Sequence, residues 1–250
     1  MNLKELFNQK RIQKTKGSGK GKIKLFNNDF FYHHGTAFYN TYKEIFEEKI
    51  YEFKPQETHS VILDCGANMG LSILYFSKYY PNSEIITFEP DEDVIPFLEK
   101  NIQSQNLNNV ELLKVGVWTD STNLEFYTDH GLGGRMDVKY KDSEAKTIKT
   151  VRLRKFLNRP IDMLKMDIEG PEYLVLKDCE DLLKNVSNIF VEYHSFFDED
   201  QELDELLALF KRNGFRYHLK ESFSRKKPFI DKYIVCEKYD MAINVFAYKK

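Results

Sequence analysis

Short apolar runs alternate with longer amphipathic stretches along most of the chain. The pattern predicts strands near residues 61–64, 84–89, 110–115, 161–166 and 188–193. It predicts helices near residues 70–79, 91–105, 171–184 and 199–213. The last helix should end at Asn213-Gly214, because glycine commonly follows a helix C-terminus. Two further apolar runs, 215–219 and 243–248, could supply a terminal hairpin, and the whole order predicts a doubly wound α/β fold.

The N-terminal part of the chain has a different character. Residues 1–24 carry eight Lys or Arg against one Glu, and residues 16–22 have the composition of a flexible linker. This leader could include a short amphipathic helix with Leu3, Leu6 and Phe7, or serve as a basic docking site. Residues 28–53 are dense in aromatic side chains, and their spacing favours a helix packed on the sheet as a cap.

One long stretch interrupts the alternation. Residues 123–151 are expected to form an insertion loop that carries Gly131-Leu-Gly-Gly-Arg135. Glycine-rich loops next to a strand often cover active sites, so we expect this loop near the site.

Composition narrows the classes of function. Lys plus Arg (37) nearly balances Asp plus Glu (39), so no overall field favours nucleic acid or an anionic membrane. Cys65, Cys179 and Cys236 stand alone in apolar runs, as expected for buried thiols in a reducing cytoplasm. No signal peptide or apolar run of transmembrane length is evident, so a soluble, cytoplasmic protein is expected, whose oligomeric state the sequence leaves open.

The first predicted strand leads into a glycine-containing turn that suits a nucleoside ligand. Asp64 ends the strand, and Gly66 and Gly70 follow in the form Asp-x-Gly-x-x-x-Gly, which lacks the third glycine of dinucleotide sites and the lysine of phosphate loops. Glu89 ends the next strand, where an acid can accept hydrogen bonds from both ribose hydroxyls. Asp64 would favour a cationic ligand portion. Together these features favour S-adenosylmethionine over NAD or ATP.

A second group of polar residues follows the strand at 161–166. Asp167, Glu169 and Glu172 place three acids within six residues, which requires compensation by lysine, a metal or a bound cation. Glu172 is also explained by a position at a helix N-terminus. Glu192 and His194 share one face of the next strand and should project near Asp167, where His194 could accept a proton or be a structural side chain. The same groups could instead hold a divalent ion.

With these segments in hand, the chain resembles the FkbM family of S-adenosylmethionine-dependent O-methyltransferases over most of its length. The segments that carry the resemblance are Leu63–Gly70, Phe88-Glu-Pro-Asp91, Leu164–Tyr173 and Glu192-Tyr-His194. Two more, Tyr42–Phe46 and Ile243–Tyr248, resemble bacterial members found among surface-polysaccharide genes.

The resemblance implies a Rossmann-like class I methyltransferase fold, with a doubly wound, mostly parallel seven-stranded sheet whose last strand is antiparallel. It divides the chain into a basic leader and N-terminal cap (1–55) and a methyltransferase domain (56–250). The adenine of the cofactor is expected near Gly116–Trp118. The implied residues of the cofactor site are Asp64, Gly66, Asn68, Gly70, Glu89 and Asp167.

The resemblance also implies the reaction. We expect methylation of a hydroxyl of a nucleotide-linked or otherwise activated sugar during synthesis of a capsule or another surface glycan. Methyl transfer requires alignment and a base, for which His194 and Asp167 are the candidates, oriented by Glu169 and Glu192. Arg135 is expected to approach an anionic part of the substrate. The expected substrate contacts are Arg135, Glu192 and Tyr42.

Two alternatives stay open at this point. The first is a metal-assisted O-methyltransferase with Asp167 and Glu192 as ligands, acting on a non-sugar metabolite or a vicinal diol. The second is a non-catalytic protein that binds S-adenosylmethionine and assembles with a partner through its basic N-terminus. RNA methylation is disfavoured by the balanced charge.

Overall fold

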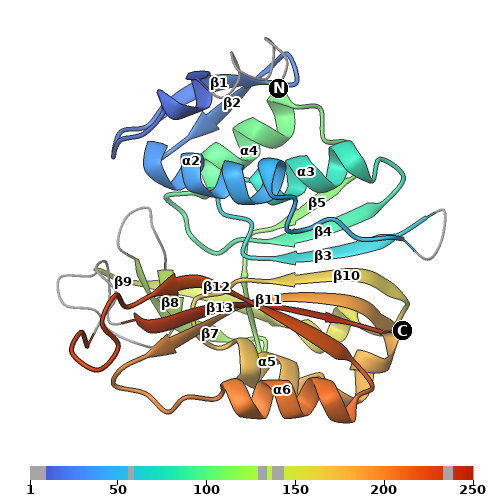
Figure 1. Ribbon diagram of the computed structural model, residues 1–250. Coiled ribbons are helices and arrows are strands. Elements are labelled where there is room, and N and C mark those ends of the chain that lie inside the picture. Colours follow the sequence, from blue (N-terminus) through green and yellow to red (C-terminus); the bar gives the residue numbers. More distant parts are fainter. Residues whose placement is uncertain (1–9, 56–58, 129–133, 137–143, 233–238, 250) are drawn as a thin grey trace.

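A central sheet with helices on both faces organises the chain (Figure 1). The computed structural model describes residues 10–55, 59–128, 134–136, 144–232 and 239–249. Within these residues the large sheet has seven strands in the order β12-β13-β11-β10-β3-β4-β5. Their bounds are β3 Val61–Cys65, β4 Glu84–Phe88, β5 Val110–Leu113, β10 Ile161–Met166, β11 Val186–Phe196, β12 Arg216–Ser224 and β13 Tyr239–Tyr248.

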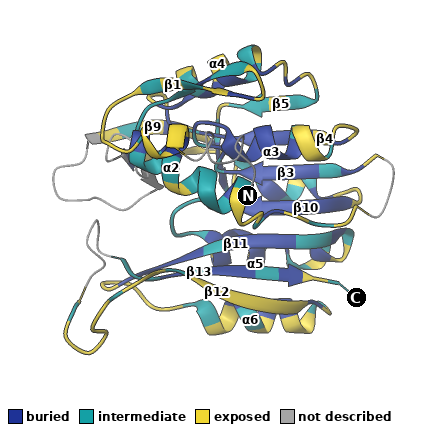
Figure 2. Cartoon of the chain, turned by 45° about the horizontal axis from the view of Figure 1, so that its top comes forward, coloured by how far each residue is buried: buried dark blue, intermediate teal, exposed yellow. Residues whose placement is uncertain are grey.

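The pairing of these strands confirms the expected fold class. Strands β11, β10, β3, β4 and β5 are parallel to one another. The last strand, β13, lies antiparallel between β11 and β12, so the terminal apolar runs form the expected antiparallel pair. Parallel strands β3 and β10 are buried on both faces, which is why they read as continuous apolar runs, whereas edge strand β12 is largely exposed (Figure 2).

Helices cover both faces of this sheet. One face packs against α5 (Glu172–Asp178) and α6 (Leu203–Arg212), and the other against α2 (Gly35–Tyr42), α3 (Leu71–Tyr79) and α4 (Ile95–Ser104). The predicted helices are present, but α4 and α6 begin four residues later than predicted. The helix expected over 171–184 ends at Asp178 and is followed by the 3₁₀ segment η3 (Glu180–Asn185). A second 3₁₀ segment, η2 (Leu153–Phe156), precedes β10.

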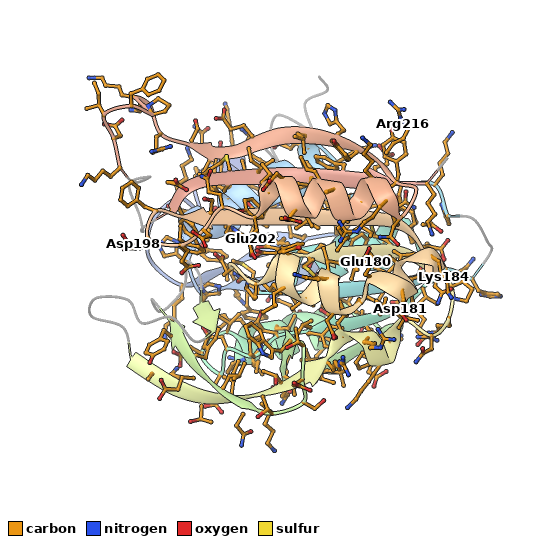
Figure 3. The ribbon with its side chains drawn as sticks, turned by 90° about the horizontal axis from the view of Figure 1, so that it is seen from below. Glu180, Asp181, Lys184, Asp198, Glu202 and Arg216 are labelled. Carbon is orange, nitrogen blue, oxygen red and sulfur yellow. The ribbon has the colours of Figure 1, made fainter. Side chains whose placement is uncertain are left out.

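The outer surface of α5, η3 and α6 is charged (Figure 3). Arg212 Nε donates to Glu180 Oε1 at 2.5 Å, and Arg154 Nη2 donates to Asp181 Oδ2 at 2.7 Å. Such exposed ion pairs contribute little to stability, so this face is an ordinary solvated surface. None of the described helices is long and apolar enough to cross a membrane.

The N-terminal segment packs on the α3–α4 side of the sheet. Strands β1 (Gly21–Leu25) and β2 (Asn28–Tyr32) form a hairpin, followed by α2 and the short π-helical segment η1 (Lys43–Glu47). The prediction of a flexible linker over 16–22 is therefore wrong at its C-terminal end, because Gly21 and Lys22 belong to β1 and pair with β2. The helix considered for Leu3, Leu6 and Phe7 lies outside the described residues.

Asn101 on α4 fastens this hairpin to the rest of the fold. Its Oδ1 accepts from Phe31 N at 2.7 Å, and its Nδ2 donates to Phe31 O at 2.7 Å and to Met69 O at 2.8 Å. Phe30 and Phe38 are fully buried in the same hydrophobic cluster as Ile62 of β3. The cap and the sheet thus share a core, and the domain boundary at residue 55 stays a prediction.

The expected insertion loop over 123–151 is wrong for most of its length. Strands β6 (Gly116–Trp118), β7 (Asn123–Thr128), β8 (Gly134–Met136) and β9 (Glu144–Arg152) form a second sheet in the order β6-β9-β7-β8. The reason is a small core of its own: buried Phe126 of β7 packs with Ile148 of β9 and with Trp118. Residues 129–133 and 137–143, including most of the glycine-rich segment, lie outside the described residues.

Candidate active site

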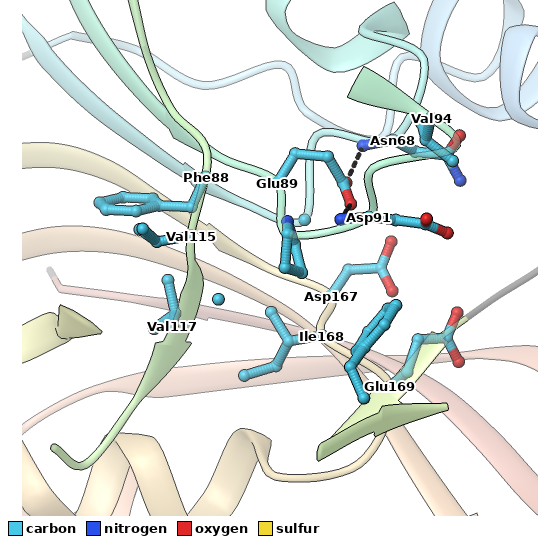
Figure 4. Close-up of a pocket in the computed structure, with 14 residues that line it drawn as sticks. Asn68, Phe88, Glu89, Asp91, Val94, Val115, Val117, Asp167, Ile168 and Glu169 are labelled. Carbon is cyan, nitrogen blue, oxygen red and sulfur yellow. Dashed lines mark hydrogen bonds between the residues drawn. The ribbon is translucent and has the colours of Figure 1, made fainter. Parts of the chain in front are cut away.

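A pocket opens where the parallel strands end. The space between its walls, open mouth included, is about 660 Å³. Ligands of open α/β sheets bind at this carboxyl edge (Figure 4). Its lining residues are Gly66, Asn68, Phe88, Glu89, Pro90, Asp91, Val94, Val115, Gly116, Val117, Phe126, Asp167, Ile168 and Glu169.

The turn after β3 is shaped by glycine. Gly66 has φ +86°, and a Cβ there would lie 1.9 Å from the backbone oxygen of Asp167, so the two turns approach as closely as only glycine permits. Gly70 has φ +93° and immediately precedes α3. Asn68 lines the pocket between them, and its Oδ1 accepts from Met69 N at 2.7 Å. The predicted loop residues Gly66 and Asn68 therefore line the pocket, whereas Gly70 shapes the start of the helix.

Glu89 stands at the end of β4 and faces this turn. Its Oε2 accepts from Asn68 N at 2.7 Å and its Oε1 accepts from Asp91 N at 2.9 Å, as the dashed lines of Figure 4 mark. Burial raises the pKa of Glu89 to about 7, against the lowering effect of these backbone hydrogen bonds. The side chain is 6% exposed and held in one orientation at the pocket wall.

Asp64 lies beneath the turn and does not line the pocket. Its Oδ2 accepts from Ser72 Oγ at 2.7 Å and from Thr87 Oγ1 at 3.1 Å. Burial raises the pKa of Asp64, and Lys165 opposes the rise. The predicted cofactor residue Asp64 thus supports the loop from below.

Lys165 is a buried cation between two acids. Its Nζ lies 3.5 Å from Asp64 Oδ1 and 3.4 Å from Asp167 Oδ2, and it donates to the carbonyl oxygens of Cys65 and Gly66. Burial alone would lower the pKa of Lys165, but Asp167 and Asp64 raise it above its ordinary value. Lys165 therefore supplies part of the positive charge that the acids at 167–172 require. The sequence analysis did not single out this lysine.

His194 is held between two other acids of the same group. Its Nδ1 lies 3.0 Å from Glu172 Oε1, and its Nε2 lies 3.6 Å from Glu169 Oε2. Burial alone would lower the pKa of His194, but Glu169 and Glu172 raise it well above its ordinary value. Glu172 Oε1 also accepts from Gly170 N at 3.0 Å, so Glu172 caps the turn and fixes the imidazole.

Glu169 and Glu192 flank His194. Burial raises the pKa of Glu169 to about 8, although His194 opposes the rise, and Tyr239 donates a hydrogen bond to this carboxylate. Glu192 accepts from Ser222 Oγ at 2.6 Å, and burial followed by repulsion from Asp167 raises its pKa. One ligand atom from each of Asp167, Glu192 and His194 lies within 4.8 Å of the others, which confirms that Glu192 and His194 project near Asp167.

The structure places the predicted substrate contact Tyr42 outside the pocket lining and describes only the backbone of Arg135, another predicted contact. Tyr42 belongs to an aromatic stack in the cap, with its ring centroid 5.0 Å from Phe46 and 5.9 Å from Phe38, and it is not among the pocket residues. Its role as a substrate contact stays a prediction. The backbone of Arg135 pairs with Tyr127 of β7, next to the pocket residue Phe126. The side chain of Arg135 lies outside what the structure describes.

Several site residues had no signal of their own in the sequence. Phe126 and Ile168 line the pocket as apolar residues of ordinary strand and turn segments. Glu44 on η1 approaches from the cap, where burial, followed by repulsion from Glu192, raises its pKa to about 7. Only its place in the motif Tyr42–Phe46 could have drawn attention to it.

Comparisons with known proteins agree with this geometry. The model of the methyltransferase FkbM domain matches residues 64–217, more than half of the chain. Methyltransferase 1 of Beauveria bassiana (strain ARSEF 2860) is 27% identical over an alignment of 165 residues that covers 56% of this chain and 66% of that protein. The 2-O-methyltransferase NoeI of Sinorhizobium fredii (strain NBRC 101917 / NGR234) is 24% identical over an alignment of 166 residues that covers 58% of this chain and 65% of that protein.

A solved structure shows the same fold. The FkbM methyltransferase from Methylobacillus flagellatus KT superposes with a TM-score of 0.51 at 14% identity, over 80% of this chain and 46% of that chain. The chain thus spans slightly under two thirds of the two curated relatives and less than half of this solved protein. The family match, the strand order and the pocket at the carboxyl edge agree, and the chain belongs to the FkbM family of methyltransferases, with the class I S-adenosylmethionine-dependent fold.

Proposed function

We propose that this chain is an S-adenosylmethionine-dependent O-methyltransferase that methylates a hydroxyl of a nucleotide-linked sugar during synthesis of a surface glycan. One observation carries the proposal: Asp167 lines the pocket beside Glu89 and also belongs to a cluster with Glu192 and His194 at the ends of β10 and β11. A nucleoside site and a polar acceptor site therefore share a wall.

The residues of the pocket fit S-adenosylmethionine. Glu89 offers the remaining lone pairs of a buried carboxylate to the two ribose hydroxyls. Val115 and Val117 supply an apolar wall for adenine where it was expected, around Gly116. The missing side chain of Gly66 leaves space at the turn, and the acid at Asp167 suits a sulfonium. When bound, the cofactor supplies an electrophilic methyl group.

The chain's own residues must align the acceptor oxygen and take its proton. Asp167 is the favoured base, because it lines the pocket and belongs to the cluster with Glu192. His194 is held between Glu169 and Glu172 and is not among the pocket residues, so we assign it a positioning role. Glu169 and Glu192 would orient the acceptor by accepting hydrogen bonds from its hydroxyls.

The sugar substrate is the finer part of the proposal. Carboxylate oxygens on several sides of one space suit a ligand with many hydroxyl donors. The relative from Sinorhizobium fredii is a 2-O-methyltransferase by name, which supports transfer to oxygen. Arg135 would meet an anionic group such as a phosphate or uronate. The buried free thiols of Cys65 and Cys179 suit a reducing compartment such as the cytoplasm.

The test is incubation of the purified chain with S-adenosylmethionine and a panel of neutral, amino and nucleotide-linked sugars, with S-adenosylhomocysteine and methylated product measured by mass spectrometry. Asp167→Asn should abolish turnover while calorimetry still detects the cofactor. Cofactor binding without turnover on any acceptor would support the non-catalytic alternative. Full activity of Asp167→Asn would refute the assignment of the base.

Metal-assisted transfer to a hydroxyl is the second candidate function. The specific observation in its favour is the cluster of Asp167, Glu192 and His194. A parallel incubation with EDTA separates the two candidates, since only the metal-assisted reaction should lose its product.

A further inference from the structure

We propose that Asp167, Glu192 and His194 form a binding site for one divalent transition-metal ion of the Mn²⁺ type, on the acceptor side of the pocket. The proposal deepens the second candidate function, metal-assisted transfer, at the same site. It depends on that function only for the ion's role in the reaction, because the site would bind its ion without cofactor or acceptor.

The three ligands come from rigid positions. Asp167 directly follows β10, and Glu192 and His194 are alternate residues of β11, which pairs in parallel with β10. One ligand atom from each lies within 4.8 Å of the others. Ligands about 2.0–2.2 Å from one ion are separated by up to about 4.4 Å, so small side-chain rotations suffice to close the site.

Glu172 prepares the imidazole as a ligand. This fully buried carboxylate holds Nδ1 of His194 at 3.0 Å, the arrangement that fixes metal-binding histidines in orientation. The other nitrogen, Nε2, lies 3.6 Å from Glu169, too far for a hydrogen bond. His194 is 7% exposed, so Nε2 lies inside the protein, on the side of the ring opposite the atom that Glu172 holds.

Asn244 supplies an independent indication of a cation. It stands directly opposite Glu192 in the register of β11 and β13, so both side chains lie on one face of the sheet. Asn244 is 3% exposed, and its Oδ1 has no hydrogen-bond partner among the described residues. A buried amide oxygen without a partner is costly, and amide oxygens are ligands of hard cations. An ion beside Glu192 would satisfy it.

The acids around the proposed site outnumber the described cations beside them. The described acids around this space are Asp64, Asp167, Glu169, Glu172, Glu192 and Glu44, and the buried lysine among them is Lys165, whereas His194 would bind the ion as a neutral imidazole. Lys165 forms ion pairs with Asp64 and Asp167, and Lys220 of β12 forms an ion pair at the surface with Glu48. Negative charge therefore remains in excess beside Glu192 and Glu44.

The ligand set indicates the kind of ion. Carboxylates alone would suit Mg²⁺ or Ca²⁺, but an imidazole nitrogen favours first-row transition ions. Manganese accepts both ligand types, so Mn²⁺ is the probe of choice.

Direct binding tests the site. The full chain, freed of metal with EDTA and without cofactor or acceptor, is titrated with Mn²⁺ while the electron paramagnetic resonance signal of free Mn²⁺ is recorded. We expect one ion per chain, and a thermal midpoint that rises by about 5 °C or more at a hundredfold excess over Kd. Mg²⁺ and Ca²⁺ should compete weakly.

Variants locate the ion. Glu192→Gln should weaken Mn²⁺ binding at least about tenfold, and Glu172→Gln about 10–100-fold through the orientation of His194. Glu48→Gln removes an acid of the same size at the nearby surface and should leave binding unchanged. His194→Gln provides a second ligand variant should Glu192→Gln fold poorly.

Two outcomes overturn the proposal. One is the absence of bound Mn²⁺, or binding that Glu192→Gln and His194→Gln leave intact. The other is a chain that binds no ion but is stabilised by an amino sugar. That result would assign the space around Asp167, Glu192 and His194 to a cationic acceptor. Because the assay contains no methyl donor, failure of the proposed methylation would leave this result unaffected.

Discussion

Replacement of Lys165 by methionine is the sharpest test of how the site is held together. Lys165 is 2% exposed and lies 3.5 Å from Asp64 Oδ1 and 3.4 Å from Asp167 Oδ2. Methionine keeps an unbranched stem of similar length and removes only the charge and its hydrogen bonds. The substitution therefore isolates the buried cation from the packing around it.

The expected loss follows from the burial of Asp64. This carboxylate is 0% exposed and would retain only the hydroxyls of Ser72 and Thr87 as donors. Removing one partner of a buried pair costs about 3–5 kcal/mol, because the other charge is left without compensation. For a chain of this size that loss lowers the thermal midpoint by about 6–20 °C. Adding Asp64→Asn should restore at least about half of the loss, since the unpaired charge disappears.

Urea unfolding at pH 7 measures these free energies for the native chain, Lys165→Met, the double variant and Lys211→Met. Lys211 is an exposed lysine of α6, so its variant should stay within about 0.5 kcal/mol of the native chain. A Lys165→Met variant within about 1 kcal/mol of the native chain would refute the reasoning. A double variant less stable than the single one would do the same.

Three further substitutions probe the pocket and the cap. Glu89→Gln should weaken S-adenosylmethionine binding about 10–100-fold at pH 8, as measured by calorimetry, because it replaces a charged acceptor. Since the pKa of Glu89 is raised from 4.5 to about 7, its contribution to stability is present below pH 4.5 and lost as the pH rises through 7, so the variant should flatten this part of the stability profile. Gly66→Ala should abolish cofactor binding and destabilise more than Gly214→Ala in thermal melts, because both have positive φ but only Gly66 meets backbone at 1.9 Å. Asn101→Ala should cost about 2–3 kcal/mol and speed hydrogen exchange in the β1–β2 hairpin, whose fastening bonds it removes.

The large sheet could be predicted from the sequence because its strands bury both faces. A run such as Val61–Cys65 is apolar throughout and ends at a glycine turn, which leaves few other interpretations. The sheet over 116–152 could not be predicted in the same way. Its strands are short and half exposed, and buried Phe126 and Ile148 are brought together only by pairing between β7 and β9.

The candidate site, too, could be predicted from the sequence only in part. Glu192 and His194 could be placed near Asp167, because residues two apart on a strand share a face and parallel strands end at one edge. The roles of Lys165 and Asn244 depend on which neighbours surround them, and a single lysine or asparagine in a strand carries no sign of that. His194 shows the limit most clearly. Its position was predictable, but its protonation depends on Glu169 and Glu172 lying on opposite sides of the ring.

The distribution of charge links the chemical class of the acceptor to the presence of a metal ion. Lys165 offsets Asp64 and Asp167, whereas Glu44 and Glu192, on what would be the acceptor side under the proposed function, have no lysine of comparable burial beside them among the described residues. A nucleotide-linked sugar would bring the negative charges of its phosphates toward that side, and like charges in a buried site cost several kcal/mol. A divalent ion removes this conflict, because it offsets the acids and attracts the anion. An enzyme that methylates nucleotide sugars should therefore bind its acceptor more tightly with Mn²⁺ present, whereas one that methylates a neutral sugar should show no such coupling. Acceptor affinity measured with and without the ion thus decides between the two classes of substrate.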